Sequence, residues 1–216
     1  MLKFEKTTTN LSYTDDEMYL ILSECENYIK ESKSKPIEFI RTQLKNLIYF
    51  SYGSGMRSGE IIGLEWKDVD FKNKTLNINK TMRNGRIKTT KTEASIRVID
   101  MSEESYNALI FQKELCMDID CETVFLTQYK KPYTNVSDIS KGSWKTYLKF
   151  CNIEYRKFYN LRHTFATKVL SNGGKVHQLS GHLGHKQIST TMNRYVDSNF
   201  YKGMLGGKSI INDTLN

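Results

Sequence analysis

The feature that most constrains the fold is a change in the spacing of apolar residues along the chain. Over residues 20–48 they recur at steps of three and four, which predicts two amphipathic helices separated near Pro36. Over residues 66–101 they alternate instead, and Asn84-Gly85 is a strong signal for a hairpin turn. This switch predicts a small antiparallel sheet inserted between helices.

Helical spacing returns after the sheet. Ser102 followed by two glutamates predicts a helix start, because a serine can cap the first turn and acidic side chains favour that end. Residues 96–99 are expected to form a further strand. Further helices are predicted over residues 134–150, 160–171, 176–181 and 187–195, with breaks at Gly173-Gly174 and Gly181. We therefore expect an α+β domain, mainly helical, with a small three-stranded antiparallel sheet.

Composition limits the class of protein. The chain has 216 residues, 38% of them hydrophobic, which suffices for the core of one domain or one domain with a small appendage. It has neither an apolar run long enough to span a membrane nor a charged-then-apolar leader, so we expect a soluble, cytoplasmic protein. The four cysteines form no C-x-x-C pair, which argues against a zinc ribbon and fits free thiols in a reducing compartment.

The net charge of +8 is unevenly distributed. Residues 72–100 hold eight lysines and arginines against two acids, whereas residues 101–122 hold one lysine against six acids. A second basic stretch, 129–168, is interleaved with aromatic residues. Such stretches usually contact a phosphate backbone, although a solvated lysine-rich surface is the alternative on charge alone. The residues expected to contact DNA are Arg83, Arg86, Lys88 and Lys145.

Two arginines stand where a phosphate could be held. Arg57 follows a Gly-Ser-Gly stretch and opens a predicted helix, and Arg162 begins another. The planar guanidinium stays charged and can hold two phosphate oxygens at once. His185 follows a Leu-Gly pair, and Tyr195 comes ten residues later. An arginine, a histidine and a tyrosine at these spacings suit a DNA phosphate that a tyrosine hydroxyl attacks.

These motifs resemble the catalytic domain of the tyrosine recombinases, the phage-integrase family, over residues 11–196. The sequences that carry the resemblance are Gly55-Met56-Arg57-Ser58-Gly59-Glu60, Leu161-Arg162-His163-Thr164 and Leu183-Gly184-His185. The resemblance implies site-specific DNA cleavage and rejoining through a 3′-phosphotyrosyl intermediate, without metal, ATP or another cofactor. It implies catalytic roles for Arg57, Lys91, Arg162, His185 and Tyr195, and supporting roles for Glu60, Tyr159 and His163.

Two of these roles have competitors within the sequence. Lys91 is assigned as the proton donor to the departing 5′-oxygen, and Lys88, two residues earlier, would lie on the same strand face. Tyr195 is assigned as the nucleophile, and Tyr201 has no comparable motif around it.

The histidines raise separate questions. Tyr159 stands where family members usually carry a histidine, and it can donate a hydrogen bond to phosphate but offers no imidazole. His163, next to Arg162, is expected to pack against the helix or buttress the site. His182 and His185 could suggest a metal, but no third ligand is evident, so no metal is expected.

The resemblance also implies a domain plan and partners. Residues 1–10 form an extension, residues 11–196 the catalytic domain, and residues 197–216 a tail. Because the segment beyond the nucleophile often docks on a neighbouring subunit in this family, residues 196–210 are expected to pack in trans, with a strand closing its own domain as the alternative. The implied partners are double-stranded DNA, further copies of the chain (a tetramer on DNA, a monomer when free) and, as a candidate, an accessory DNA-bending protein.

Several functions remain open within this resemblance. The chain could be a phage or mobile-element integrase, part of a longer one, or a short invertase. A catalytically weak or inactive DNA-binding member of the same fold is the main alternative. A type IB topoisomerase shares the phosphotyrosine chemistry, but the Leu-Gly-His and Gly-Met-Arg motifs favour a recombinase.

Overall fold

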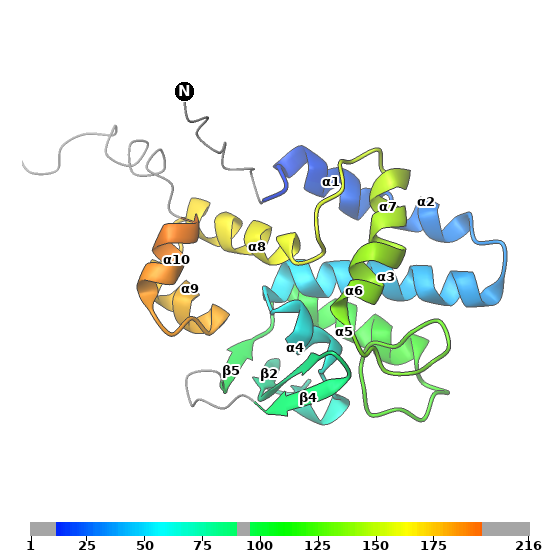
Figure 1. The fold of residues 1–216 in the computed structure, drawn as a ribbon, viewed down its shortest axis with the longest axis horizontal. Coiled ribbons are helices and arrows are strands. Elements are labelled where there is room, and N and C mark those ends of the chain that lie inside the picture. Colours follow the sequence, from blue (N-terminus) through cyan, green and yellow to red (C-terminus); the bar gives the residue numbers. More distant parts are fainter. Residues whose placement is uncertain (1–11, 90–95, 196–216) are drawn as a thin grey trace, which may run out of the picture.

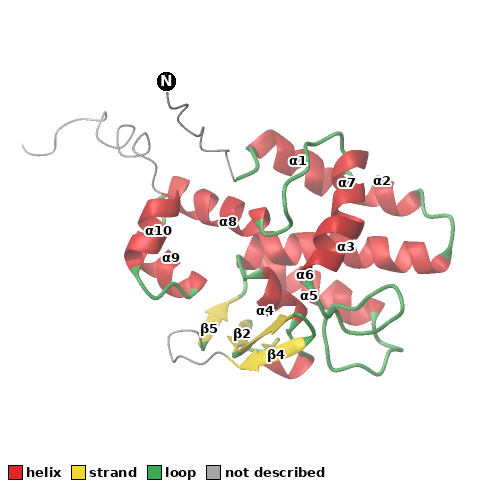
Figure 2. Cartoon of the chain, viewed as in Figure 1, coloured by secondary structure: helices red, strands yellow, loops and turns green. Residues whose placement is uncertain are grey.

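The computed structural model describes residues 12–89 and 96–195. It is a mainly helical α+β domain with small antiparallel sheets, as the sequence predicts (Figures 1 and 2). The helices are α1 (Asp15–Ser23), α2 (Cys25–Lys30), α3 (Lys35–Ser54), α4 (Ser58–Ile62), α5 (Glu103–Leu115), α6 (Val136–Asp138), α7 (Trp144–Phe150), α8 (Asn160–Ser171), α9 (Val176–Leu183) and α10 (Ile188–Tyr195), with a 3-10 turn at Trp66–Asp68 and a π turn at Ile139–Ser143. The strands are β1 (Val69–Asp70), β2 (Thr75–Ile78), β3 (Lys80–Arg83), β4 (Arg86–Thr89) and β5 (Arg97–Asp100).

Helix α3 is the central element of the main core. Its buried Leu47, Ile48 and Phe50 belong to that core, and the helix contacts α5 and α8. Figure 1 shows α1, α2 and α7 on one side of α3 and α5 on the other. Pro36 lies in its first turn, where a proline removes no helical hydrogen bond, so the predicted break before α3 is confirmed. Burial of these large side chains of α3 fixes the position of the end of the helix, at Gly55.

The predicted hairpin is present, but it belongs to its own sheet. Asn84 and Gly85 adopt positive φ angles of 51° and 69°, as a tight hairpin turn requires. The three-stranded antiparallel sheet has the order β1-β2-β5, and β3-β4 form a separate two-stranded sheet. The third strand is therefore β1, which is only two residues long and gave no alternating pattern. The hairpin instead packs against α4. Because Gly59 and Gly63 have no side chain, β3 can approach the backbone of α4 closely.

The predicted break at Gly181 is wrong. Helix α9 continues to Leu183 and ends at Gly184, which adopts a left-handed φ of 67°. The amide of His185 donates to Ser180 O at 3.0 Å and that of Gly184 to Gly181 O at 3.0 Å, which satisfies two of the carbonyls in the last turn of the helix. The helix predicted over 134–150 is likewise divided, with non-helical backbone at Gly142. The helix predicted over 160–171 matches α8.

The left-handed end of α3 provides a test of this architecture. Gly55 has a φ of 61°, and a Cβ there would lie 2.2 Å from Phe165 Cδ1. Gly55→Ala should therefore add a left-handed backbone cost of about 1–2 kcal/mol to an overpacking cost of about 1–3 kcal/mol. Urea unfolding followed by circular dichroism measures the sum.

Gly173→Ala is the matched control, because Gly173 has a φ of 83° and nothing within 4 Å of an added Cβ. It should show the backbone cost alone. Equal destabilisation by the two substitutions would mean that Phe165 does not press on the α3 terminus.

Candidate active site

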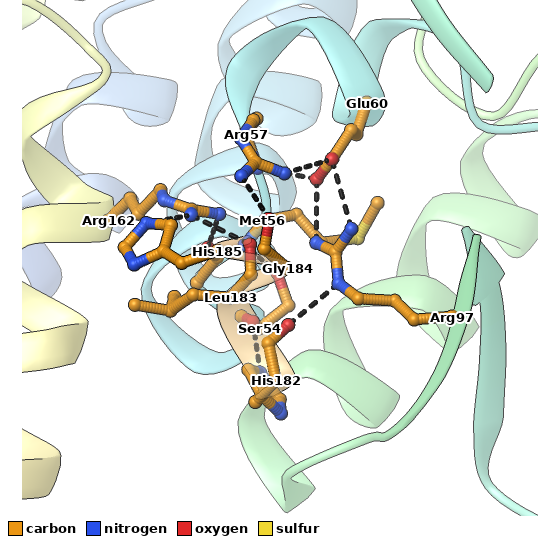
Figure 3. A network of polar contacts seen from close by, with 11 residues as sticks. Ser54, Met56, Arg57, Glu60, Arg97, Arg162, His182, Leu183, Gly184 and His185 are labelled. Carbon is orange, nitrogen blue, oxygen red and sulfur yellow. Dashed lines mark hydrogen bonds and ion pairs between the residues drawn. The ribbon is translucent and has the colours of Figure 1, made fainter. Parts of the chain in front are cut away.

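The candidate site is built where two helices end against each other. The last carbonyls of α3, at Ser54 and Gly55, and those of α9, at His182, Leu183 and Gly184, each accept a hydrogen bond from an arginine or histidine side chain (Figure 3). Carbonyls at a helix C-terminus lack helical partners and carry partial negative charge. Cationic side chains are therefore the natural groups to satisfy them.

Arg162 links the two helix ends directly. Its Nη1 donates to Gly55 O at 2.9 Å and its Nη2 to Leu183 O at 2.8 Å, and the residue is only 1% exposed. Burial, and then the charge of Arg57, lower the pKa of Arg162 to about 10, so it stays protonated at neutral pH. Its buried Nε has no hydrogen-bond partner within residues 12–89 and 96–195. This guanidinium is thus held by neutral carbonyls, and its charge is not cancelled by a carboxylate bonded to it.

Arg57 is the more open of the two predicted arginines. It precedes α4, and its side chain is 33% exposed. Nη1 donates to Glu60 Oε1 at 2.8 Å, and Nη2 donates to Gly184 O at 2.7 Å. The arrangement fixes the direction of the guanidinium while leaving part of it accessible.

Glu60 is the carboxylate of the site and is shared between two arginines. It is 3% exposed and accepts hydrogen bonds from Arg57 and from both terminal nitrogens of Arg97. Burial raises the pKa of Glu60, but the hydrogen bonds and charges of Arg97 and Arg57 outweigh it, so the pKa lies below its usual value. From the sequence, Arg97 is a member of a basic stretch and of the strand expected over residues 96–99, and it is not among the predicted site residues. An arginine near the start of a predicted strand does not reveal its partner.

His185 joins Arg162 to the helix that carries Tyr195. Arg162 Nη2 lies 3.1 Å from His185 Nε2, and since the guanidinium can only donate, a hydrogen bond here requires Nε2 to accept and the ring proton to be on Nδ1. Nδ1 then donates to Thr191 Oγ1 at 2.7 Å. Thr191 is buried one turn before Tyr195 on α10.

Tyr195 lies against two histidine rings. Its ring is parallel to that of His185, with centroids 6.5 Å apart, and 5.4 Å from that of His163. Tyr159 meets His163 edge-on, with ring centroids 5.0 Å apart. Tyr195 is 8% exposed and belongs to a small apolar cluster formed by α8 and α9. The structure therefore brings Tyr195, both arginines and His185 together, and the His163 ring contacts the rings of Tyr159 and Tyr195.

His182 makes contacts that differ from those of His185. Its Nε2 donates to Ser54 O at 2.7 Å, and its ring stacks on Phe165 with centroids 5.2 Å apart. Burial lowers the pKa of His182. Among the described residues, no three metal-ligating side chains come close enough to hold a metal.

The remaining predicted residues lie outside this cluster. Lys91 falls in residues 90–95, outside the described residues, and Tyr201 lies in the tail, which is also outside them.

Lys88 is exposed on β4 opposite Thr81. The exposed residues predicted to contact DNA are Arg83 and Arg86 beside the hairpin turn, and Lys145 on α7. A hydrogen bond of 2.8 Å from the amide of Gly85 to Thr134 O holds the hairpin turn against the segment that leads into α6 and α7.

The sequence of this chain matches that of a known protein family. A family model described as the phage integrase family matches residues 13–202. The chain belongs to the phage integrase family. The resemblance drawn from the Gly-Met-Arg, Leu-Arg-His and Leu-Gly-His motifs is thereby confirmed.

Individual members of the phage integrase family are similar to this chain at moderate identity. A tyrosine recombinase XerC-like protein of Caldanaerobacter subterraneus subsp. tengcongensis is 31% identical over 204 residues, covering 81% of this chain and 51% of that protein. The transposase from transposon Tn916 of Enterococcus faecalis is 30% identical over 173 residues, covering 70% of this chain and 41% of that one. The chain thus spans about half the length of the curated relatives it matches.

The fold agrees with a solved member of the family. The Tn1549 transposon integrase, in complex with a circular intermediate DNA, superimposes with a TM-score of 0.75 at 21% identity, covering 94% of this chain and 67% of that one. In the part of the chain that the structure describes, no helix is long and apolar enough to cross a membrane.

The buried imidazole of His182 predicts that the contact between α3 and α9 stabilises the protein less at acidic pH. Because its pKa is lower in the folded protein than the usual 6.5, the unfolded chain takes up the proton first as the pH falls, and stability decreases below that pH. Every pH unit over which only the unfolded chain is protonated removes about 1.4 kcal/mol. Urea unfolding between pH 7 and 5 should therefore show a flatter pH dependence for His182→Gln than for the wild type.

His177→Gln is the matched control, since His177 is exposed on the same helix. It should retain the pH dependence of the wild type. If all three proteins lose stability equally over this range, His182 is not the group that titrates.

Proposed function

We propose that the protein cleaves and rejoins DNA strands at specific sites, with Tyr195 as the nucleophile that forms a 3′-phosphotyrosyl bond. The observation that carries this proposal is that Arg57, Arg162 and His185 gather at the end of α9, where Arg162 contacts His185 and the His185 ring lies parallel to that of Tyr195, with both guanidiniums anchored by helix-end carbonyls. A phosphodiester needs such a cationic site, because negative charge builds on its nonbridging oxygens as the tyrosine oxygen attacks.

The chemistry assigns one task to each group. The Tyr195 oxygen bonds to phosphorus, and the bond from phosphorus to the 5′-oxygen breaks. The bond energy is kept in the phosphotyrosine, so a 5′-hydroxyl can later attack it and restore the strand without ATP or metal. Arg57 and Arg162 stabilise the nonbridging oxygens, and Lys91 protonates the departing oxygen. The positive charges around Tyr195 favour its phenolate, which is scarce for a free phenol at neutral pH.

His185 must change its hydrogen bonding when a phosphate arrives. In the free protein its Nε2 accepts from Arg162, whereas donation to a phosphate oxygen requires a proton on Nε2. Thr191 is suited to both states, because its hydroxyl can accept from Nδ1 or donate to it. The exchange would release Arg162 Nη2 toward the phosphate while His185 stays tied to the Tyr195 helix.

The relatives suggest the biological setting. One is named as a transposon transposase, and the solved integrase was crystallised with a circular intermediate of transposon DNA. We infer that the chain acts on double-stranded DNA of a phage or mobile element, within the cell and as a tetramer whose residues 196–210 dock in trans. Arg83, Arg86, Lys88 and Lys145 would contact its backbone.

A second candidate is a DNA-binding member with weak or no turnover. Tyr159 favours it, since a phenol takes the position where a histidine is usual and lies edge-on to His163 beside Tyr195. Such a protein would bind DNA without forming a covalent adduct.

Covalent trapping separates these two candidates. The protein is incubated with nicked duplexes from which the cleaved fragment diffuses away, then denatured and examined for a protein–DNA band. We expect a band in the wild type and none in Tyr195→Phe, which lacks the attacking oxygen but retains the ring contacts with the histidines. DNA affinity should be nearly unchanged.

Tyr201→Phe is the control, because Tyr201 is the other candidate nucleophile in the sequence. It should give the wild-type band. Salt-sensitive DNA binding without any band in the wild type would favour the second candidate, and a band lost only in Tyr201→Phe would move the nucleophile to that residue.

The proton donor can be identified with a modified leaving group. Lys91→Ala should slow cleavage by about 10²–10⁴-fold, the usual contribution of general acid catalysis. A substrate with sulfur in place of the bridging 5′-oxygen leaves as a thiolate and needs no proton, so it should restore the rate of Lys91→Ala.

Lys88→Ala is the matched control, and its rate should depend little on the sulfur substitution. Rescue of Lys88→Ala in place of Lys91→Ala would exchange the two assignments.

A further inference from the structure

We propose that Arg97 is a positioning residue of the strand-cleavage site, which holds Arg57 in place through Glu60 and the end of α9 without contacting DNA. This role rests on the proposed strand cleavage, and it concerns a residue whose partners are far away in the sequence.

The contacts of Arg97 are directed inward. Its Nε donates to His182 O at 2.7 Å, its Nη1 to Glu60 Oε1 at 3.1 Å and its Nη2 to Glu60 Oε2 at 2.9 Å (Figure 3). The two parallel bonds to Glu60 fix the plane of the carboxylate as well as its position. Arg97 is poorly placed to hold a phosphate, because both of its terminal nitrogens are paired with the Glu60 carboxylate, which offsets its charge. The terminal nitrogens of Arg162, in contrast, donate to neutral carbonyls.

Both partners of the Arg57 side chain depend on Arg97. One partner is Glu60 Oε1, whose carboxylate Arg97 orients. The other is Gly184 O, at the end of the helix that Arg97 holds through His182 O. Removing Arg97 would therefore loosen both hydrogen bonds that direct the Arg57 guanidinium.

Gly184 allows this arrangement by its lack of a side chain. A Cβ there would lie 2.8 Å from Arg97 Nη1, and the residue also needs its φ of 67° to end α9. The guanidinium of Arg97 thus lies directly against the backbone turn that presents Gly184 O to Arg57.

The charges around Glu60 give this role a distinct pH signature. The charged groups that act on the carboxylate are Arg57 from the start of α4, Arg97 from β5 and Arg162 from α8. Without Arg97, burial would act on Glu60 with less compensation and its pKa would rise. Protonated Glu60 no longer carries the charge that attracts Arg57, so the acid limb of the cleavage rate should move to higher pH.

The experiment is a double-mutant cycle on covalent adduct formation with nicked duplexes at saturating DNA. Arg97→Met and Glu60→Gln should each slow cleavage by about 10²-fold, because small displacements of a positioned group have effects of that size. Their combination should be no slower than the slower single variant, since both act through the same carboxylate. DNA affinity and its salt dependence should match the wild type.

The pH profile supplies the readout that a loss of folding would not produce. Arg97→Met should shift the acid limb to higher pH, the shift should vanish in the Glu60→Gln background, and Arg97→Lys should restore part of the rate. Arg156→Met is the matched control, because Arg156 makes the same two-pronged pair with Glu17 at 2.7 Å for each bond. It should lower the unfolding midpoint without moving the acid limb.

The outcomes distinguish this role from the proposed function. If the wild type forms an adduct and the losses multiply in the double variant, Arg97 acts independently of Glu60. If Arg97→Met instead binds DNA more weakly and with less salt dependence, Arg97 contacts DNA. Either result would overturn the positioning role alone. Wild-type rates and pH profiles in Arg97→Met would overturn it as well. Absence of any adduct in the wild type would overturn strand cleavage and this role with it.

Discussion

The candidate site depends on the meeting of two helix C-termini. Helix α3 ends at Gly55 and α9 ends at Gly184, both in the left-handed conformation. Their last carbonyls lie close enough for one side chain, that of Arg162, to donate to both ends. Carbonyls at such ends need donors, and guanidinium groups supply several from one side chain. Arg162 bridges the two ends, Arg57 and Arg97 reach the α9 end, and His182 reaches the α3 end.

This mode of anchoring leaves positive charge available. Backbone carbonyls accept the hydrogen bonds of a guanidinium without cancelling its unit charge. A carboxylate would accept the same hydrogen bonds and also cancel the charge. Among the described residues, the hydrogen bonds of Arg57, Arg97 and Arg162 reach a single carboxylate, that of Glu60, so three positive charges meet one negative charge. The surplus of two makes the site suited to an anion. Burial lowers the pKa of Arg162 only to about 10, so the surplus persists at neutral pH.

The sequence predicted the parts of the site that rest on local motifs. The change of period placed the sheet, the extent of α8 was predicted to the residue, and Arg57, Arg162, His185 and Tyr195 were selected together. Arg97 was missed because its partner Glu60 lies 37 residues away and its other acceptor is a backbone carbonyl, neither of which leaves a local pattern. The end of α9 was misplaced because Gly181 and Gly184 look alike in sequence, and only the backbone conformation tells which one ends the helix.

The polar contacts of the site also join two apolar cores. The main core surrounds α3, whereas Leu170, Leu179, Leu183 and Tyr195 belong to a second, smaller cluster. The hydrogen bonds of Arg57, Arg97, Arg162 and His182 cross between the α3–α4–β5 part and the end of α9. All three guanidiniums therefore hold the two parts together, and those of Arg57 and Arg162 are also candidate phosphate ligands. A lysine carries the same charge but cannot span two carbonyls with a planar fork. Arginine is therefore required at these positions by the fold as well as by the phosphate, and the formation of the anion site is coupled to the docking of the helices that carry Tyr195.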